Sequence, residues 1–436
     1  MKMDMETPKN VKLSAFYKRS FAHYTIKERL PVILTKIIDY LVREKEEISK
    51  EYQTDISEDL KTVIGEISKL KYEIQTNKEL KPLTDVNGPD AKIWNDYLVE
   101  QSKDEIPTYF NTTWLYAECY VYRRLKDIFD CTLLKNFDPF RNQKQDAYFT
   151  SHDAMTLVSE FLVYQLHKCL RKDEELEIFF KKLMKLCLWG NKCDLSLSLG
   201  AESSQKQDPL DELDSLDKFI IVDHIDDIWK VLNTFCAGTI TIVTDNAGYE
   251  LFTDLCLADF LITSNYASQV HFRVKAMPWF ISDVMPKDFN WLIDTACKSA
   301  DENVAMLGKR WLDYQINGKF LMQSDVFWTL PHAYAEMKNV DSELYTDLSK
   351  SNLIIFKGDL NYRKLLGDIN WETTTCFHDS LRGFNPTDLC ALRTLKADLV
   401  SGLKPGDEER LQKESSEWLI SGEYGVIQYD PNCECI

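Results

Sequence analysis

Residues 239–250 read Thr-Ile-Thr-Ile-Val-Thr-Asp-Asn-Ala-Gly-Tyr-Glu, and this stretch decides the fold class. Its first six residues are all β-branched, which is typical of a buried strand. Asp245 and Asn246 end the predicted strand, and a helical pattern follows over about residues 247–261. A strand that passes through a short turn into a helix is the first half of a strand–helix–strand unit, so we predict a parallel sheet.

The same alternation recurs towards the C-terminus. Further strands are predicted at 270–275, 326–328, 353–356 and 390–394, with helices at 289–296 and 362–366. Strands that alternate with helices indicate an α/β fold in which a mostly parallel sheet carries helices on both faces.

The N-terminal region differs in its periodicity. Apolar residues recur there at helical spacing, as in Ile33, Ile37 and Leu41 after Pro31, and no strand alternation interrupts them. The last helix of this region is predicted over 174–189 and is expected to end at Gly190, because glycine favours helix C-termini. A polar segment at 196–217 is predicted to be a surface loop. We therefore expect an all-helical region at 1–190 and an α/β domain at 191–436.

Composition narrows the class of protein. The chain has 436 residues with 52 basic and 70 acidic side chains, a net charge of −18, which argues against nucleic acid and anionic membranes as partners. No apolar run approaches the roughly 20 residues that span a bilayer. The first ten residues are polar, so no secretory signal is expected, and the 12 cysteines fit reduced thiols. We expect a cytoplasmic protein, with the nucleus as a second compartment.

Candidate chemistry lies where the predicted strands end, because ligands of open α/β sheets bind at that edge. Asp245, Asn246 and Asp283 supply hard oxygen ligands there. These suit Mg²⁺ or Mn²⁺. Lys357, Arg363 and Lys396 supply cations for phosphate oxygens. A divalent metal with cationic side chains is the combination that phosphoryl transfer to water requires.

Each of these residues also fits a local structural role. Asp245 is a suitable cap for the helix that follows it, and Asp283 is suited to a turn before Pro286. Lys396 fits a solvated surface charge equally well. Only their recurrence at successive strand ends favours the functional interpretation.

Four motifs in order resemble the domain-of-unknown-function 89 family, whose members are metal-dependent damage-control phosphatases. They are Trp-Gly-Asn-Lys-Cys-Asp-Leu-Ser at 189–196, Asp-Asn-Ala-Gly-Tyr-Glu at 245–250, Phe-Lys-Gly-Asp-Leu-Asn-Tyr-Arg at 356–363 and Arg-Thr-Leu-Lys at 393–396. The last of these is similar to the signature of subfamily III. The resemblance extends over about residues 21–429.

The resemblance implies a Rossmann-like α/β domain and a phosphatase that acts on sugar phosphates such as fructose 1-phosphate and fructose 6-phosphate. It implies Mn²⁺ as cofactor, with Co²⁺, Ni²⁺ or Mg²⁺ as substitutes, held by Asp245, Asn246 and Asp283. These three would be the catalytic residues. The implied substrate contacts are Asp245, Asn246, Asp359, Leu360, Asn361, Tyr362, Arg363 and Lys396. Glu250, Asn191 and Arg393 lie in family motifs and are expected to support the site or a cofactor.

Two questions stay open at the level of sequence. The attacking group is either a metal-bound water or Asp245 itself. The activity is either this phosphatase or a methyltransferase that uses S-adenosylmethionine on Glu and Asp side chains, an activity also attributed to the family. No glycine-rich turn that would hold a nucleoside cofactor is present, and a non-catalytic binding module is the third interpretation.

Overall fold

The structure is a computed structural model that describes residues 3–84, 88–167, 173–203 and 211–432, without the side chains of residues 167, 173, 191–203 and 211–212. Within these residues seven strands form one sheet in the order β1-β7-β6-β5-β2-β3-β4. All neighbouring pairs are parallel except β6 and β7. The strands are β1 (Ile220–Asp223), β2 (Gly238–Val243), β3 (Ala267–Arg273), β4 (Phe320–Gln323), β5 (Leu353–Lys357), β6 (Leu389–Thr394) and β7 (Gly425–Asp430).

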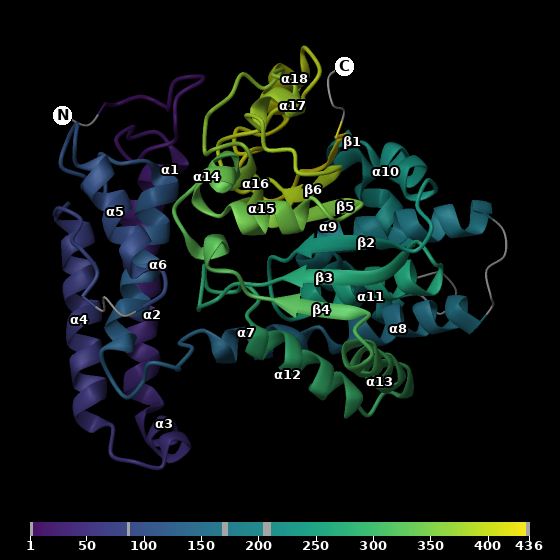
Figure 1. The fold of residues 1–436 in the computed structure, drawn as a ribbon, viewed down its shortest axis with the longest axis horizontal. Coiled ribbons are helices and arrows are strands. Elements are labelled where there is room, and N and C mark those ends of the chain that lie inside the picture. Colours follow the sequence, from purple (N-terminus) through teal and green to yellow (C-terminus); the bar gives the residue numbers. More distant parts are fainter. Residues whose placement is uncertain (1–2, 85–87, 168–172, 204–210, 433–436) are drawn as a thin grey trace.

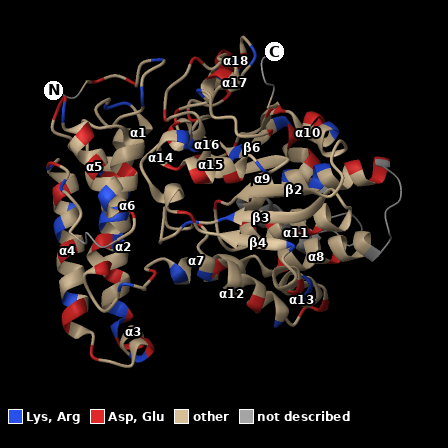
Figure 2. Ribbon diagram, in the orientation of Figure 1, with Lys and Arg blue, Asp and Glu red and all other residues tan. Residues whose placement is uncertain are grey.

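The N-terminal region is helical and stands beside the sheet (Figure 1). It comprises α1 (Phe21–Tyr24), the π-helical turn η1 (Thr25–Arg29), α2 (Leu30–Arg43), α3 (Lys45–Tyr52), α4 (Ser57–Gln75), α5 (Ala91–Gln101) and α6 (Trp114–Asp130). Acidic and basic residues are interspersed along α2 to α4 (Figure 2), and pairs such as Lys61 with Glu58 lie one turn apart. The buried stripe of α4, which includes Val63, Ile67 and Leu70, faces inward.

Alternate residues of the central strands enter two different cores. Ile354 and Phe356 of β5 pack into one hydrophobic cluster, and Leu353 and Ile355 pack into the other. Because successive side chains of a strand point to opposite faces, these clusters are the two faces of the sheet. The predicted α/β fold, with helices on both faces, is confirmed.

One face is covered by helices from before and between the strands: α7 (Arg141–Thr150), α8 (His152–His167), α9 (Asp173–Ser203), α10 (Ile225–Leu232), α11 (Tyr249–Thr263), α12 (Pro286–Cys297) and α13 (Glu302–Ile316). The other face carries η3 (Val326–Thr329), η4 (Tyr334–Glu336), α14 (Met337–Val340), α15 (Ser342–Leu348), α16 (Gly358–Leu365) and α17 (Phe377–Ser380). The N-terminal helices belong to the same hydrophobic cluster but stand beside the sheet, beyond the ends of β2 to β4 (Figure 1). The helices η2 (Asp211–Phe219) and α18 (Asp407–Glu414) complete the described elements. Among the described residues, no helix is long and apolar enough to cross a membrane.

Two predictions of secondary structure, at residues 326–328 and after Gly190, are wrong. Residues 326–328 form the 3₁₀ helix η3 and not a strand, because the Asp325 side chain accepts a hydrogen bond from the Trp328 indole and closes a turn (2.9 Å). The helix predicted to end at Gly190 continues to Ser203, so part of the predicted loop at 196–217 is helical. Serine and aspartate disfavour a helix only weakly, and the leucines between them favour it. The predicted division between residues 190 and 191 therefore falls inside α9.

Candidate active site

The site lies at the point where the winding of the sheet reverses. From β2 the chain proceeds to β3 and β4 on one side, whereas β5 and β6 lie on the other side of β2. The carboxyl ends of β2 and β5 are therefore neighbours, with Val243 paired to Phe356. Asp245 and Gly358 follow these ends directly. Open α/β sheets bind their ligands in this crevice.

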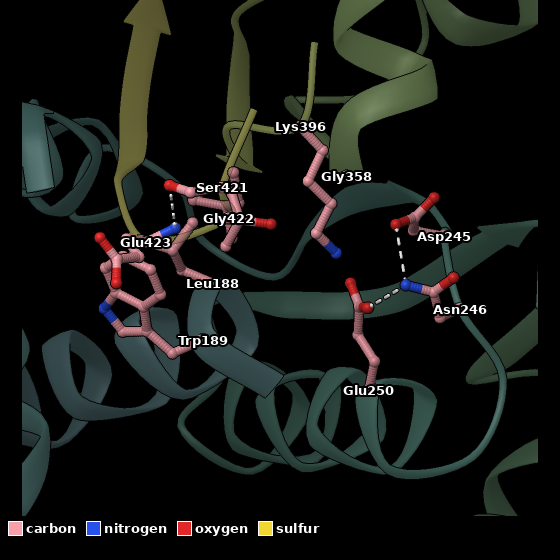
Figure 3. A pocket seen from close by; sticks show the side chains of 12 residues that line it. Leu188, Trp189, Asp245, Asn246, Glu250, Gly358, Lys396, Ser421, Gly422 and Glu423 are labelled. Carbon is pink, nitrogen blue, oxygen red and sulfur yellow. Dashed lines mark hydrogen bonds between the residues drawn. The ribbon is translucent and has the colours of Figure 1, made fainter. Parts of the chain in front are cut away.

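A cavity of about 300 Å³ opens there (Figure 3). Asp245, Asn246 and Glu250 lie at one end, and Lys396 reaches in from the segment that follows β6. The rest of the lining is Leu188, Trp189, Gly358, Leu392, Thr394, Ser421, Gly422 and Glu423. Lys396 is the one lysine or arginine among the residues that line this cavity, and its side chain points towards Glu250 and Asp245 (Figure 3).

Asp245 lies in tight contact with the start of α16. A Cβ placed on Gly358 would lie 2.0 Å from Asp245 Oδ2, and Gly358 has a φ of +82°. Both the close approach and the positive φ require glycine at this position. The Asp245 carboxyl therefore packs against bare backbone at a helix N-terminus, where unpaired N–H groups and the helix dipole favour an anion.

Asn246 is oriented by hydrogen bonds at both ends of its carboxamide. Its Nδ2 donates to Asp245 Oδ2 at 3.1 Å and to Glu250 Oε2 at 2.7 Å. Its Oδ1 accepts from Ser282 Oγ at 2.5 Å. An amide nitrogen donates and carboxylates accept, so the two carboxylates dictate which end faces them.

Asp283 joins the site through the backbone. A bridge pairs Asn246 with Asp283, and Val284 N donates to Asp245 O at 2.9 Å. Asp283 is 2% exposed, and its Oδ2 lies 3.3 Å from Lys275 Nζ. The three residues predicted to hold a metal are therefore brought together, although Asp283 lies 37 positions beyond Asn246 in the chain.

The carboxylates of this cluster disfavour one another's charge. Burial, together with the negative charges of Glu250 and Asp283, raises the pKa of Asp245 well above its ordinary value. Burial also raises the pKa of Asp283, while the Lys275 ammonium acts in the opposite direction. A cation among these oxygens would relieve both effects.

Contrary to the prediction, Lys357 does not face the cavity. It is buried, and its Nζ lies 2.7 Å from Asp254 Oδ1 and 3.1 Å from Glu250 Oε1. Burial acts against its charge, but the two carboxylates hold the Lys357 pKa above its ordinary value. Lys357 is therefore committed to these partners on α11 and is not a phosphate ligand here.

The side chains of residues 360–363 are also engaged within the protein. Asn361 donates to the carbonyls of Lys357 (2.7 Å) and Thr244 (3.1 Å) and accepts from the Tyr334 hydroxyl. Arg363 pairs with Asp368 and Glu118 and covers the Trp114 ring at 3.5 Å. Leu360 and Tyr362 are buried, and the Tyr362 hydroxyl donates to Gln428. Their side chains are therefore not available to a substrate. Of these residues, Leu360 lies in the first turn of α16 and can offer a backbone N–H group.

Asp359 and Arg393 form a supporting pair. Arg393 Nε donates to Asp359 Oδ1 at 2.8 Å, and the same oxygen accepts from Lys396 N at 3.3 Å. Arg393 is fully buried and also donates to the carbonyls of Leu399 and Ala397. This arrangement orders the segment that carries Lys396.

Asn191 follows Gly190 in α9. The Asn191 side chain lies outside the described residues. A Cβ on Gly190 would lie 3.3 Å from Glu250 Cβ, so glycine lets α9 approach α11 closely beside the cavity.

Sequence reasoning missed several residues of the site. Lys275, Ser282 and Asp254 support Asp283, Asn246 and Lys357, respectively. A charge at the end of the strand predicted at 270–275 was the available signal for Lys275. The segment 421–423 carried no motif, and only the fold brings it to the cavity.

Fold and site together define an α/β protein with a small-ligand pocket at the switch point of its sheet. The chain belongs to the family described as the damage-control phosphatase ARMT1-like domain, whose model matches residues 25–411. This confirms the family predicted from the four motifs.

Relatives match over nearly their whole length. Damage-control phosphatase ARMT1 of Danio rerio is 41% identical over 96% of this chain and 96% of its own. The proteins of that name from Mus musculus and Homo sapiens are each 42% identical, over 96% and 94% of this chain and 98% and 96% of their own. Among solved structures, a DUF89 family protein from Pyrococcus horikoshii matches with a TM-score of 0.38 and 15% identity, over 80% of this chain and 96% of that chain. The predicted class, a phosphatase of the damage-control type, agrees with the names of the relatives.

Proposed function

We propose that this protein is a metal-dependent phosphatase that hydrolyses sugar phosphates, with fructose 1-phosphate and fructose 6-phosphate as substrates and Mn²⁺, Co²⁺, Ni²⁺ or Mg²⁺ as cofactor. One observation carries the proposal. A pocket at the switch point combines the oxygens of Asp245 and Asn246 with the ammonium of Lys396 and the N-terminus of α16, and a backbone bridge places Asp283 beside Asn246.

The residues fit a divalent cation. Asp283 Oδ2 is buried with the Lys275 ammonium at 3.3 Å as its contact, and Asp245 is crowded by like charges. Two carboxylates and a carboxamide oxygen are the donors that hard cations prefer. Asp245, Asn246 and Asp283 would hold the cation, and a cation so held would polarise the phosphoryl group and offset its charge.

The other residues have separate tasks. Lys396 neutralises charge on the phosphoryl oxygens, and the first turn of α16 directs backbone N–H groups towards the same edge. Lys275 balances the Asp283 carboxylate and holds it in place. Lys396 and the α16 terminus stabilise the charge that develops during transfer, because they are already in place before the reaction.

The test is phosphate release from a panel of sugar phosphates by protein stripped of metal and then supplied with Mn²⁺, Co²⁺, Ni²⁺ or Mg²⁺. We expect release only with metal. Asp283→Asn should lower it about 100-fold or more, because a metal contributes several kcal/mol of charge stabilisation. This variant also removes the carboxylate beside Lys275, but it keeps the volume of the side chain and an oxygen that can accept a hydrogen bond from the buried ammonium, whereas alanine would leave a cavity there.

Different results would contradict the metal assignment and the phosphatase activity. Normal metal-supported activity in a folded Asp283→Asn protein contradicts the metal assignment. No release with any metal contradicts the phosphatase, and binding of S-adenosylmethionine would then separate a methyltransferase from a non-catalytic module.

A further inference from the structure

A chain of buried polar groups runs from the core to the cavity. Glu250 and Asp254 lie four residues apart on α11 and so share one face of that helix. Lys357, the last residue of β5, points its Nζ between them, at 3.1 Å and 2.7 Å. Glu250 lines the cavity, whereas Asp254 does not and is 1% exposed.

The chain continues from Glu250 to the predicted metal ligands. Glu250 uses Oε1 for Lys357 and Oε2 for Asn246 Nδ2. This bond holds the amide nitrogen on the side of Glu250 and leaves Asn246 Oδ1 on the side of Ser282, next to Asp283 in sequence. Nδ2 also donates to Asp245 Oδ2 at 3.1 Å, and the shorter bond to Glu250 acts with it to present the oxygen, which is the end of the carboxamide that can bind a cation.

Asp254 determines how Lys357 acts on Glu250. With Asp254 present, one ammonium is shared between two carboxylates, and the shorter contact is to Asp254. Without that charge, the buried ammonium has Glu250 as its one remaining carboxylate among the described ion pairs. Attraction in a poorly solvated interior is strong, so Glu250 would turn both oxygens towards Lys357 and release Asn246.

We propose that Asp254 is a positioning residue that acts through Lys357 and Glu250 to orient the carboxamide of Asn246 for cation binding. The part of this inference that concerns the cation rests on the proposed function. The part that concerns the position of Asn246 does not.

The experiment compares the full chain with Asp254→Asn and a matched control, Asp259→Asn. Asp259 is also a buried carboxylate of α11, but it pairs with Arg310 Nε (2.8 Å) and the Trp311 indole (3.0 Å) and has no part in the chain to Asn246. Both changes remove one buried charge from the same helix. A general loss of stability should therefore appear in both variants.

Two readouts separate positioning from stability. Crystal structures without metal should show the bond between Asn246 Nδ2 and Glu250 Oε2 broken in Asp254→Asn and intact in Asp259→Asn. The electron paramagnetic resonance signal of free Mn²⁺ should show affinity about tenfold weaker in Asp254→Asn, the loss typical for residues that orient metal ligands. Asp254→Glu, which restores the charge, should recover most of that affinity.

The proposal is overturned if Asp254→Asn keeps both the Asn246–Glu250 bond and the Mn²⁺ affinity of the unaltered protein. It is also overturned if Asp259→Asn weakens Mn²⁺ binding equally. Should Asp254→Asn not fold, Asp254→Ser removes the same charge and is judged by the same outcomes. Absence of Mn²⁺ binding in the unaltered protein contradicts the proposed function, and the pair of crystal structures still decides the positioning.

Discussion

Gly358→Ala is the substitution that the structure predicts most sharply. Gly358 opens α16 with a φ of +82°, and an added Cβ would lie 2.0 Å from Asp245 Oδ2 and 2.1 Å from its Cγ. Real Cβ atoms essentially never approach another heavy atom closer than 3.0 Å. The Asp245 carboxyl must therefore shift by about 1 Å, or the start of α16 must move away from it.

The expected losses come in two parts. A left-handed backbone costs alanine about 1–2 kcal/mol relative to glycine, which lowers the free energy of unfolding. Displacement of a reacting group by about 1 Å lowers the rate about 100-fold. Gly383→Ala separates the two parts, because Gly383 also has a φ of +82° and its added Cβ would meet nothing within 4 Å.

The assay is metal-supported release of phosphate from fructose 1-phosphate, with urea unfolding measured on the same preparations. Both variants should lose about 1–2 kcal/mol of stability, and only Gly358→Ala should lose activity. A Gly358→Ala protein within twofold of the normal rate would refute the reasoning that the contact of Asp245 with α16 matters for turnover. Equal loss of activity in Gly383→Ala would refute it as well.

Three further predictions concern single side chains. Lys396→Met should lower kcat/KM for sugar phosphates about 10- to 100-fold, since a hydrogen bond to a charged group contributes about 1.5–3 kcal/mol. The melting temperature should stay unchanged because Lys396 is exposed, and unchanged kinetics would refute its role. Arg363→Met should lower the free energy of unfolding by about 3–5 kcal/mol, because Glu118 and Asp368 stay buried without their cation. The KM of the folded protein should barely change. A raised KM without loss of stability in urea would restore Arg363 as a phosphate ligand. Burial raises the pKa of Asp398 to about 6, and its Oδ1 has no hydrogen-bond partner. The folded state therefore favours the protonated acid, so this group adds stability below its unfolded pKa and that stability is lost as pH rises through about 6. Asp398→Asn should stabilise the protein by up to about 3 kcal/mol at pH 7 and by nothing at pH 3 in denaturant titrations; equal effects at both pH values would contradict the buried acid.

Much of the fold could be predicted because its signals are local. The β-branched run before Asp245 and the helix after it occur as expected, in β2 and α11. The strand predicted at 326–328 does not form, because three apolar residues favour a strand less than the Asp325 side chain favours the turn that it closes. The strands β1, β4 and β7 were missed, since strands of four to six residues carry a weak pattern.

The site could be predicted in part for a related reason. Asp245 and Asn246 stand at the end of a strong strand, so their place at the sheet edge follows from the strand itself. Lys357 and Lys396 both follow predicted strands, and sequence alone could not distinguish them, whereas in the structure Lys357 is the last residue of β5. Only the packing of α11 against β5 commits Lys357 to Asp254, while the segment after β6 leaves Lys396 facing the cavity.

The sequence by itself determined the fold class, the family and the sheet edge at which the polar residues gather. These follow from hydrophobic periodicity and from motifs that the chain carries in order. The tertiary structure alone decided which side chains face the pocket, because burial and ion pairing depend on neighbours far away in sequence. Arg363 meets Glu118 across 245 positions, and Lys357 meets Asp254 across 103, contacts that no local pattern encodes.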